Sequence, residues 1–310
     1  MGMEGNNREA GNMSFKMCMG IYGLENLFDG DPRGLITLAQ QAEEAGFDQL
    51  SMTDHVVMGS RTDRYPYGDF PTPPETPWLE PMITQAAIAS CTKKIELSQG
   101  ILISPLRSPA LLAKQVGTLD AFAPGRVVLG LGSGWQREEF EASGLPFEGR
   151  KHYMFEQIGA MQALWREAPA SYHGERINFD AIYCRPAPAE GVPCWVGVKA
   201  TEENCAAMAK VGDGWIPMKQ DPLAEGVQAL RRAFEAAGRD PDDLAVRAMV
   251  DFQFTSDGVP DLEATLETIP PLLDAGATHI EILPLYFVQE PAAFPEFCEK
   301  ALAARQRYGR

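Results

Sequence analysis

The chain places a histidine directly after a carboxylate at the end of an apolar run, in Ser51-Met52-Thr53-Asp54-His55. An imidazole gains and loses a proton near neutral pH, and a neighbouring carboxylate can fix its position and tautomer. His55 and Asp54 are therefore the catalytic candidates. The alternative is that Asp54 caps the following turn and His55 only hydrogen-bonds to a neighbour.

A second candidate is the glycine inside the apolar run 97–105, where Gly100 precedes Ile101. A glycine weakens a buried strand, and it often marks a bulge or a ligand that approaches the backbone. A bulge at Gly100 would turn Ile101 toward the interior, where its side chain would back a planar ring. The alternative is a small residue that is tolerated in the packing of the interior.

Glycines at a spacing of two end another apolar run, in Gly130-Leu131-Gly132-Ser133-Gly134, just before Trp135. Glycine at a strand end lets the backbone approach a ligand closely. Gly132, Ser133 and Gly134 are therefore cofactor-binding candidates. The spacing is not the dinucleotide-binding fingerprint, because the strand and the acidic ribose partner are not in register.

The fourth candidate is the turn Gly197-Val198-Lys199-Ala200, which leads into a helix that begins near Thr201. Free backbone amides at a helix start, together with the Lys199 ammonium, suit a phosphate group. The alternative is a simple capping turn with Thr201 and Asn204 and no ligand.

The elements that position these residues form one repeating pattern, in which runs of β-strand composition alternate with amphipathic helical segments. The predicted strands are 16–22, 47–52, 94–103, 126–131, 193–198, 213–217, 245–252 and 278–283. The predicted helices are 32–45, 80–91, 109–122, 153–165, 201–210, 222–237, 261–274 and 292–305. Eight strand–helix repeats predict an α/β fold that closes into a (β/α)8 TIM barrel. Catalytic residues of such barrels come from the carboxyl ends of strands, which is where His55 lies.

Two helix–strand connections share one design, with Gly46 or Gly276 following the last helical turn. Glycine there suits the left-handed backbone that often ends a helix. Two segments depart from the repeat, the proline- and aromatic-rich 59–78 and the irregular 168–192. Long loops in a compact domain are usually functional or disordered. The aromatic residues of the first segment (Tyr65, Tyr67, Phe70 and Trp78) predict an ordered lid.

Composition narrows the class of protein. The net charge of −16 argues against nucleic acid or an anionic membrane surface as a partner. No apolar run approaches the roughly 20 residues that cross a bilayer. Residues 1–15 lack the apolar core of a secretory signal and are interpreted as a disordered leader before a single domain, 16–310. Six cysteines without a C-x-x-C pair predict free thiols in a reducing cytoplasm, and four histidines without an H-x-x-x-H pair predict no metal site.

Taken together, these segments resemble the luciferase-like monooxygenase superfamily and, within it, the branch that uses the deazaflavin coenzyme F420. The resemblance extends over the chain after residue 15 and is most specific in 108–150, with its Gly-Arg turn, glycine-rich strand end and Gly-Trp helix start. It implies a barrel with the cofactor at its C-terminal mouth. It assigns Asp54 and His55 to the cofactor ring and its proton chemistry. It also implies a cis peptide at Gly100–Ile101 behind that ring and places 197–200 on the phosphate loop.

Three positions depart from the family pattern. Val198 replaces the second glycine of the phosphate loop, and Ala200 stands where serine is common. Trp135 occupies the place of a catalytic glutamate in the sugar-phosphate dehydrogenases of the family. Glu138 and Glu139 lie close by, but the resemblance transfers the acid role to neither. Sugar-phosphate dehydrogenase activity is therefore not expected.

The resemblance implies an oxidoreductase that transfers a hydride between F420 and a small-molecule organic substrate, with a homodimer compatible with the family. An FMN-dependent monooxygenase is the alternative enzyme. A barrel that binds flavin without turnover is the alternative outside catalysis. Because a polyglutamylated deazaflavin is a long polyanion, this acidic chain would need a local basic groove. Its candidate residues are Arg61, Arg64, Arg107 and Lys199.

Overall fold

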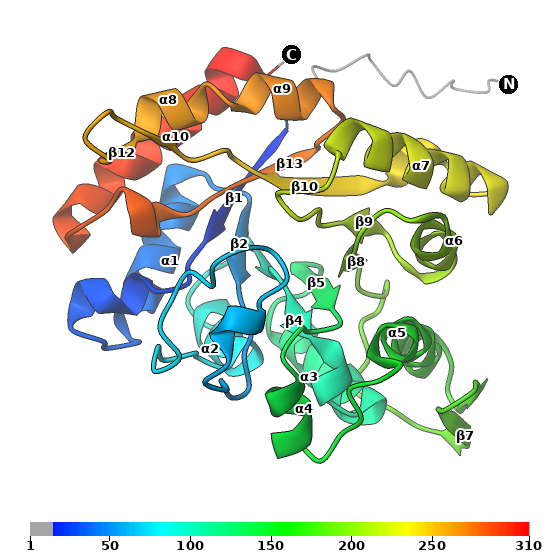
Figure 1. Cartoon of the computed structure of the whole chain (residues 1–310). Helices are drawn as coiled ribbons and strands as arrows, with labels where there is room; N and C mark the ends of the chain where they lie inside the picture. Colours follow the sequence, from blue (N-terminus) through cyan, green and yellow to red (C-terminus); the bar gives the residue numbers. More distant parts are fainter. Residues whose placement is uncertain (1–14, 310) are drawn as a thin grey trace, which may run out of the picture.

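The computed structural model describes residues 15–309, and its centre is a ring of parallel strands (Figure 1). The ring consists of β1 (Lys16–Gly20), β2 (Gln49–Met52), β3 (Glu96–Gln99) with its continuation β4 (Leu102–Ile103), β5 (Val127–Gly132), β8 (Cys194–Gly197), β9 (Gly214–Trp215), β10 (Ala245–Met249) and β13 (His279–Ile282). Each of these strands overlaps one of the eight predicted strands. The strands are buried on both faces, which is why the sequence shows continuous apolar runs rather than alternation.

The strands pair in chain order, and the last pairs with the first. β1 pairs in parallel with both β2 and β13, and parallel pairs continue through β2–β3, β3–β5, β5–β8, β8–β9, β9–β10 and β10–β13. In this register Gly132 of β5 lies opposite Gly197 of β8. The prediction of a closed (β/α)8 barrel is confirmed.

Helices surround the ring of strands (Figure 1). They are α1 (Gly34–Ala45), α2 (Pro81–Ala89), α3 (Pro109–Phe122), α4 (Arg137–Ala142), α5 (Arg150–Arg166), α6 (Glu202–Val211), α7 (Leu223–Ala236), α8 (Leu262–Leu266), α9 (Ile269–Asp274) and α10 (Phe294–Tyr308). The predicted helix 261–274 is divided in two, because Pro270 and Pro271 start a helix well but cannot continue one. Helical periodicity does not predict α4, since six residues are too few to show it, but the helix begins where the resemblance implies a Gly-Trp helix start.

The two glycine junctions adopt the predicted backbone. Gly46 has φ 107° and Gly276 has φ 100°, both in the left-handed region that favours glycine. The Gly46 amide donates to the carbonyls of Ala42 and Glu43 and so ends α1. Strands β2 and β13 begin shortly after these glycines, which places both junctions at the amino ends of the strands.

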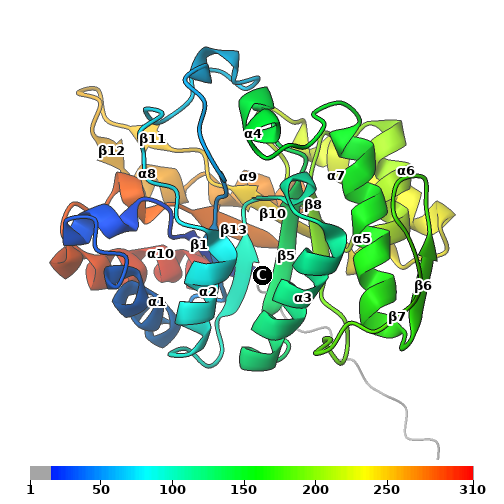
Figure 2. The same cartoon turned by 90° about the horizontal axis from the view of Figure 1, so that it is seen from below.

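We call the end of the barrel that carries the carboxyl ends of the strands the mouth. Segment 59–78 connects β2 to α2 and contains the 3-10 helix η2 (Thr62–Arg64). In Figure 2 this segment, α4 and the small hairpin of β11 (Gln253–Phe254) and β12 (Pro260–Asp261) lie at one end of the molecule. Segment 168–192 contains a second hairpin, β6 (Ala170–His173) and β7 (Asn178–Ile182), which lies beside α5.

The remaining predictions concern the chain as a whole. The predicted leader, 1–15, lies outside the described residues except for Phe15, which is buried. Among residues 15–309, no helix combines the length and the apolar character that crossing a membrane requires. All six cysteines have free thiols, and only Cys91 is partly exposed. Burial raises the pKa of Cys298 to about 12.

Candidate active site

The His55 imidazole is held by a glutamate from another part of the chain. Its Nδ1 lies 3.1 Å from Oε2 of Glu139 on α4, and the other oxygen of Glu139 accepts the Val56 amide at 3.0 Å. The His55 side chain is 8% exposed and that of Glu139 is fully buried, so water hardly competes for this contact. The pair can therefore hold one imidazole nitrogen and leave Nε2 for proton exchange.

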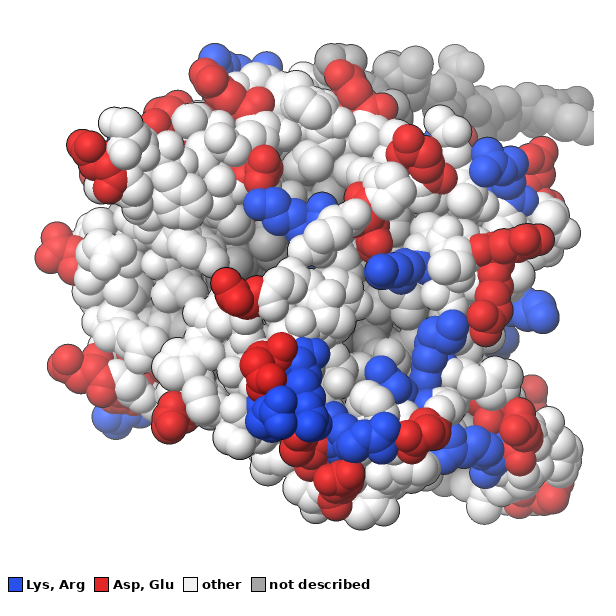
Figure 3. All heavy atoms as spheres, viewed as in Figure 1, with Lys and Arg blue, Asp and Glu red and all other residues white. Residues whose placement is uncertain are grey.

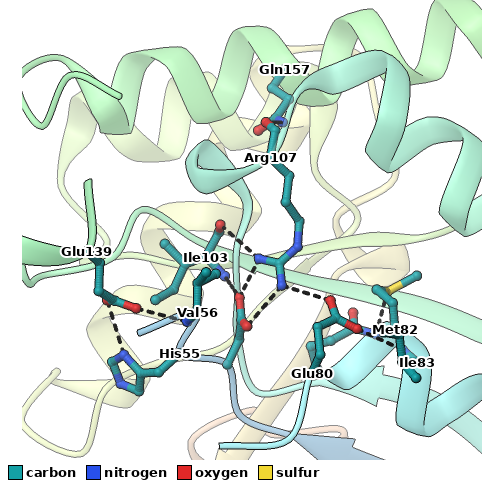
Figure 4. A network of polar contacts seen from close by, with 11 residues as sticks. His55, Val56, Glu80, Met82, Ile83, Ile103, Arg107, Glu139 and Gln157 are labelled. Carbon is teal, nitrogen blue, oxygen red and sulfur yellow. Dashed lines mark hydrogen bonds and ion pairs between the residues drawn. The ribbon is translucent and has the colours of Figure 1, made fainter. Parts of the chain in front are cut away.

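Asp54 has a different set of partners, which include Ile103 and Arg107 (both labelled in Figure 4). Its carboxylate forms a bidentate pair with Arg107, at 2.6 and 3.0 Å, and also accepts the Ile103 amide at 2.8 Å. Arg107 reaches Glu80 on the other side, at 2.9 Å. Burial disfavours the Arg107 charge, but the contacts with Asp54 and Glu80 outweigh it and raise the pKa of Arg107. Asp54 thus ties the end of β2 to the start of the segment after β4, and the carboxylate that contacts His55 is Glu139.

The aromatic side chains of segment 59–78 pack on His55. The His55 ring centroid lies 4.6 Å from that of Trp78 and 5.8 Å from that of Phe70, in edge-to-face arrangements. Trp135, which follows the glycine-rich strand end, lies 6.2 Å from His55 and 5.2 Å from Tyr65. We call these four rings the aromatic cover (Tyr65, Phe70, Trp78 and Trp135). The cover surrounds the imidazole with apolar surface and so restricts its access to water.

Segment 59–78 is attached to the mouth through its backbone. The Gln136 amide accepts from the Gly59 N–H at 2.6 Å and donates to the Gly59 carbonyl at 3.1 Å. On the far side, Gln220 donates to the Tyr67 carbonyl at 3.0 Å. These contacts, with the aromatic packing, match the ordered lid that the sequence predicts.

The glycine candidates converge on one side chain. The Gly100–Ile101 peptide is cis, as the resemblance implies. A Cβ built on Gly132 would lie 2.4 Å from Ile101 Cδ1, and one built on Gly197 would lie 2.9 Å from Ile101 Cγ2. Any larger residue at 132 or 197 would displace Ile101. We call Gly100, Ile101, Gly132 and Gly197 the Ile101 platform, because together they form one small-residue surface at the mouth.

The turn after β5 carries the other two glycine-rich candidates. Gly134 has φ 72°, a conformation that side chains rarely adopt, and a Cβ there would lie 2.7 Å from Ile103. Ser133 is partly exposed between Gly132 and Gly134. The Arg150 guanidinium donates to the Gly134 carbonyl at 3.0 Å, which places a positive charge beside this turn.

The turn at 197–200 has the predicted helix start. Thr201 caps α6 by accepting the Asn204 amide at 3.3 Å, and the Asn204 side chain donates to the Lys199 carbonyl at 2.9 Å. Val198 is buried, and its carbonyl accepts the Trp215 indole N–H at 2.7 Å. Ala200 is partly exposed and Lys199 is exposed at the rim. Hydrogen bonds from Asn204 and Trp215 thus hold the backbone of the turn, and Lys199 is directed outward.

The prediction of a basic groove is wrong for one of its four residues, Arg107. Arg107 is buried in the network of Asp54 and Glu80 and offers no charge at the surface. Arg61, just before η2, and Arg64, at its end, are exposed but pair with Asp63, at 2.7 Å, and Glu138, at 3.2 Å. Figure 3 shows Lys and Arg side chains, interspersed with Asp and Glu, over the part of the molecule where α4 and the start of α5 lie. Those elements also bring Arg137, Arg150 and Lys151.

A cavity lies away from the mouth, and the described residues contain no cluster of possible metal ligands. The cavity, of about 850 Å³, opens at the amino ends of the strands, and its lining includes Trp195 and His279. Within residues 15–309 no three histidine, cysteine or acidic side chains gather as metal ligands would.

Glu139 and Gln136 are the site residues that sequence reasoning missed. Glu139 lies 84 positions from its partner His55, so no local pattern links the two. The available signal was the Gly-Trp turn itself, which starts a short helix at the mouth. Glu138 and Glu139 are neighbours on α4, but only Glu139 is buried against His55.

Comparisons with known proteins agree with this geometry. A model of the luciferase-like monooxygenase family matches residues 17–268. An uncharacterized protein of Mycobacterium tuberculosis is 32% identical over 264 residues, which cover 78% of this chain and 93% of that protein. An F420-dependent glucose-6-phosphate dehydrogenase of Beutenbergia cavernae is 33% identical over 195 residues, 60% of this chain and 52% of that enzyme.

Solved structures share the fold at lower identity. The structure of an F420-dependent secondary alcohol dehydrogenase in complex with an F420-acetone adduct superposes with a TM-score of 0.75 at 18% identity, covering 94% of this chain and 99% of that one. The barrel and the family match confirm the resemblance found in the sequence. This chain therefore belongs to the luciferase-like monooxygenase family and is an oxidoreductase.

Proposed function

We propose that the chain binds the deazaflavin coenzyme F420 at the mouth and transfers a hydride between it and a small, partly apolar organic substrate. The observation that carries the proposal is the contact of Gly132 and Gly197 with Ile101, the residue after Gly100, at the end of the barrel that also holds His55. A planar ring needs a flat, side-chain-poor surface on one face, and the Ile101 platform supplies one. When bound, the cofactor supplies the hydride chemistry.

Unsatisfied polar atoms around the mouth support a polar cofactor. Thr53 Oγ1, Trp78 Nε1 and Asn204 Oδ1 are buried and have no hydrogen-bond partner among the described residues. Buried polar groups in native proteins are almost always paired. A ring with carbonyl and N–H edges, followed by a hydroxylated chain and a phosphate, would pair them. Thr53 precedes the Asp54–His55 pair, and Asn204 lies in the first turn of α6 beside the proposed phosphate turn.

The residues at the mouth divide the work between orientation and proton transfer. His55, held by Glu139, exchanges the proton that accompanies hydride transfer. The Ile101 platform and the aromatic cover fix the distance between the two reacting carbons, which must approach to about 3–3.5 Å. The cover also excludes water from the reacting face. Trp135 offers an indole where the dehydrogenases of sugar phosphates have an acid, which favours an apolar substrate over a phosphorylated one.

F420 is favoured over FMN by the sequence relative and by the charges. The relative from Beutenbergia cavernae is named as F420-dependent and matches at 33% identity. Lys199 and Arg150 place positive charge at the two turns that flank the Ile101 platform. An acidic cofactor tail needs such local charge on a chain with a net charge of −16.

The second candidate is an FMN-dependent monooxygenase, and one observation favours it. Three of the four basic residues expected to bind the long acidic tail are engaged elsewhere, Arg61 and Arg64 by carboxylates at the surface and Arg107 in the interior. FMN carries a single phosphate and would need only the turn at Lys199.

Parallel titration of the purified protein with F420 and with FMN tests the proposal, with intrinsic tryptophan quenching and equilibrium dialysis as readouts. We expect micromolar binding of F420 that is at least tenfold tighter than that of FMN. Gly132→Ala should weaken binding at least tenfold, because its Cβ displaces Ile101. Gly212→Ala is the matched control, since its Cβ would lie no closer than 3.2 Å to any atom and Gly212 lies at the amino end of β9. Tighter binding of FMN would replace the proposal by the monooxygenase, and binding of neither cofactor would refute both.

A further inference from the structure

A charged side chain crosses the interior of the barrel directly behind the Ile101 platform. Arg247 of β10 is 1% exposed. Its Nη1 donates to Gln49 Oε1 at 2.8 Å and to Ser98 Oγ at 3.0 Å, and its Nη2 donates to the Gln99 carbonyl at 2.6 Å. One guanidinium therefore links β10 to β2 and β3 across the barrel.

The counter-charge comes from the neighbouring strand. Nε of Arg247 lies 3.5 Å from Oε2 of Glu281 on β13, and Ser51 of β2 donates to Oε1 of the same carboxylate. Glu281 and Ser51 are 5% and 3% exposed. Removing two charges from water is costly, and hydrophobic residues of similar volume often stabilise a fold as well or better. The pair therefore calls for a reason other than stability.

The position of the pair supplies that reason. A Cβ built on Gly100 would lie 2.9 Å from Arg247 Nη2 and 3.5 Å from both Glu281 Oε1 and Ser51 Oγ. The charged groups thus occupy the space that a side chain at Gly100 would need, and the Gln99 carbonyl held by Arg247 belongs to the peptide that precedes Gly100. No apolar side chain could form this hydrogen bond to the backbone.

We infer that Arg247, with Glu281 as its counter-charge, is a positioning residue for the cofactor ring. It holds the Gln99–Gly100 backbone in the position in which the Ile101 side chain contacts Gly132 and Gly197, and so fixes the surface that supports the ring. Gln99 is held from a second side, because its side chain donates to Gln85 at 2.6 Å and accepts the Gly130 amide at 3.2 Å. The inference rests on the proposed function of the mouth.

The test compares two buried arginines that differ in position. Arg126 is 8% exposed, and its guanidinium donates to Thr92 Oγ1 and to the carbonyls of Ala89, Thr92 and Ile95. It lies just before β5, at the amino ends of the strands, away from Gly100. Arg247→Met and Arg126→Met each remove a buried guanidinium whose two terminal nitrogens are hydrogen-bonded, so both should lower the urea midpoint. The dissociation constants of F420 and FMN are measured for both variants at a temperature at which both are folded.

We expect Arg247→Met to raise the dissociation constant of the cofactor at least tenfold and Arg126→Met to leave it within twofold of the wild type. Arg247→Lys keeps the charge and one donor to the Gln99 carbonyl, so it should recover part of the affinity, and it replaces the methionine variant if that variant does not fold. Equal binding by Arg247→Met and the wild type, or an equal loss in Arg126→Met, would overturn the inference while the proposed function stands. A wild type that binds neither cofactor would refute the proposed function itself, and the inference with it.

Discussion

His279 should make the stability of the protein fall between pH 8 and pH 5.5 by a predictable amount. Its ring is 7% exposed, lies edge-to-face on Trp195 at 4.6 Å, and has no hydrogen-bond partner for Nε2 among the described residues. Burial, together with the charges of Lys16 and Arg247, lowers the pKa of His279 from 6.5 to about 3. The folded protein therefore keeps this imidazole neutral throughout that range.

The unfolded chain behaves differently. There His279 has its ordinary pKa of about 6.5, so it takes up a proton as the pH falls while the folded state does not. Stability from this residue is complete well above pH 6.5 and is lost progressively as the pH falls through and below that value. For a pKa of 6.5 unfolded and about 3 folded, the free energy of unfolding falls by about 1.4 kcal/mol between pH 8 and pH 5.5, a tenfold change in the folding equilibrium.

His279→Phe isolates this contribution. Phenylalanine keeps the edge-to-face contact with Trp195, and its extra atoms enter the cavity of about 850 Å³ beside the ring. Urea unfolding followed by circular dichroism at pH 8 and pH 5.5 gives the pH-dependent loss for each protein. All other titrating groups are present in both, so their contributions cancel in the difference. Both values of pH stay above the isoelectric point of about 4.7.

The wild type should lose about 1.4 kcal/mol more than the variant between the two values of pH. His152→Gln serves as the control, because the His152 side chain is 66% exposed and its replacement should leave the pH-dependent loss close to that of the wild type. If the wild type and His279→Phe lose the same free energy, His279 is not buried as a neutral ring and the reasoning fails.

Three further substitutions test the mouth and one junction by urea denaturation. Glu139→Ala leaves the Val56 amide and the His55 imidazole without their acceptor, so we expect the free energy of unfolding to fall by about 2–3 kcal/mol. Glu139→Gln should recover most of this loss. Equal losses in the two variants would contradict the contact. Arg107→Met leaves the buried Asp54 charge unpaired and should lower the free energy of unfolding by about 3–5 kcal/mol. Adding Asp54→Asn to the same chain should restore most of this loss. If it restores none, the unpaired charge is not the cause of the loss. The Cβ added by Gly46→Ala would lie no closer than 3.6 Å to another atom, so only the left-handed backbone at this position opposes the substitution. We expect the free energy of unfolding to fall by about 1–2 kcal/mol and cofactor binding to stay unchanged. A change in binding would show that the two ends of the barrel are coupled.

The sequence predicted the fold and the position of the mouth because both depend on local patterns. Each strand of the ring overlaps a predicted strand, and the closing pair β1–β13 follows from eight strand–helix repeats. That Gly132 and Gly197 lie at the same end of the barrel could be predicted, since the carboxyl ends of all parallel strands lie at one end of a barrel. Their common contact with Ile101 required the actual register.

The partners of the polar residues could not be predicted, because they are distant in the chain. Asp54 meets Arg107 across 53 positions, and Arg247 meets Gln49 across 198. Sequence spacing says nothing about such pairs, and proximity along the chain wrongly suggested Asp54 as the carboxylate that holds His55. One signal was available for Arg247, since an arginine in the middle of a predicted buried strand must find acceptors inside the barrel.

The attachment of segment 59–78 has a consequence for how this enzyme can change its substrate. Gln136 and Gln220 lie outside the segment, and they bind it only through the main chain of Gly59 and Tyr67. Main-chain groups are the same whatever the residue, so most side chains of the segment can be exchanged without loosening these hydrogen bonds. Gly59 itself is the exception, because a Cβ there would lie 2.8 Å from Glu138. The main-chain anchors therefore do not depend on the aromatic positions, and libraries that vary those positions while keeping Gly59, Gln136, Gln220 and the Arg64–Glu138 ion pair should keep the segment attached while altering substrate preference.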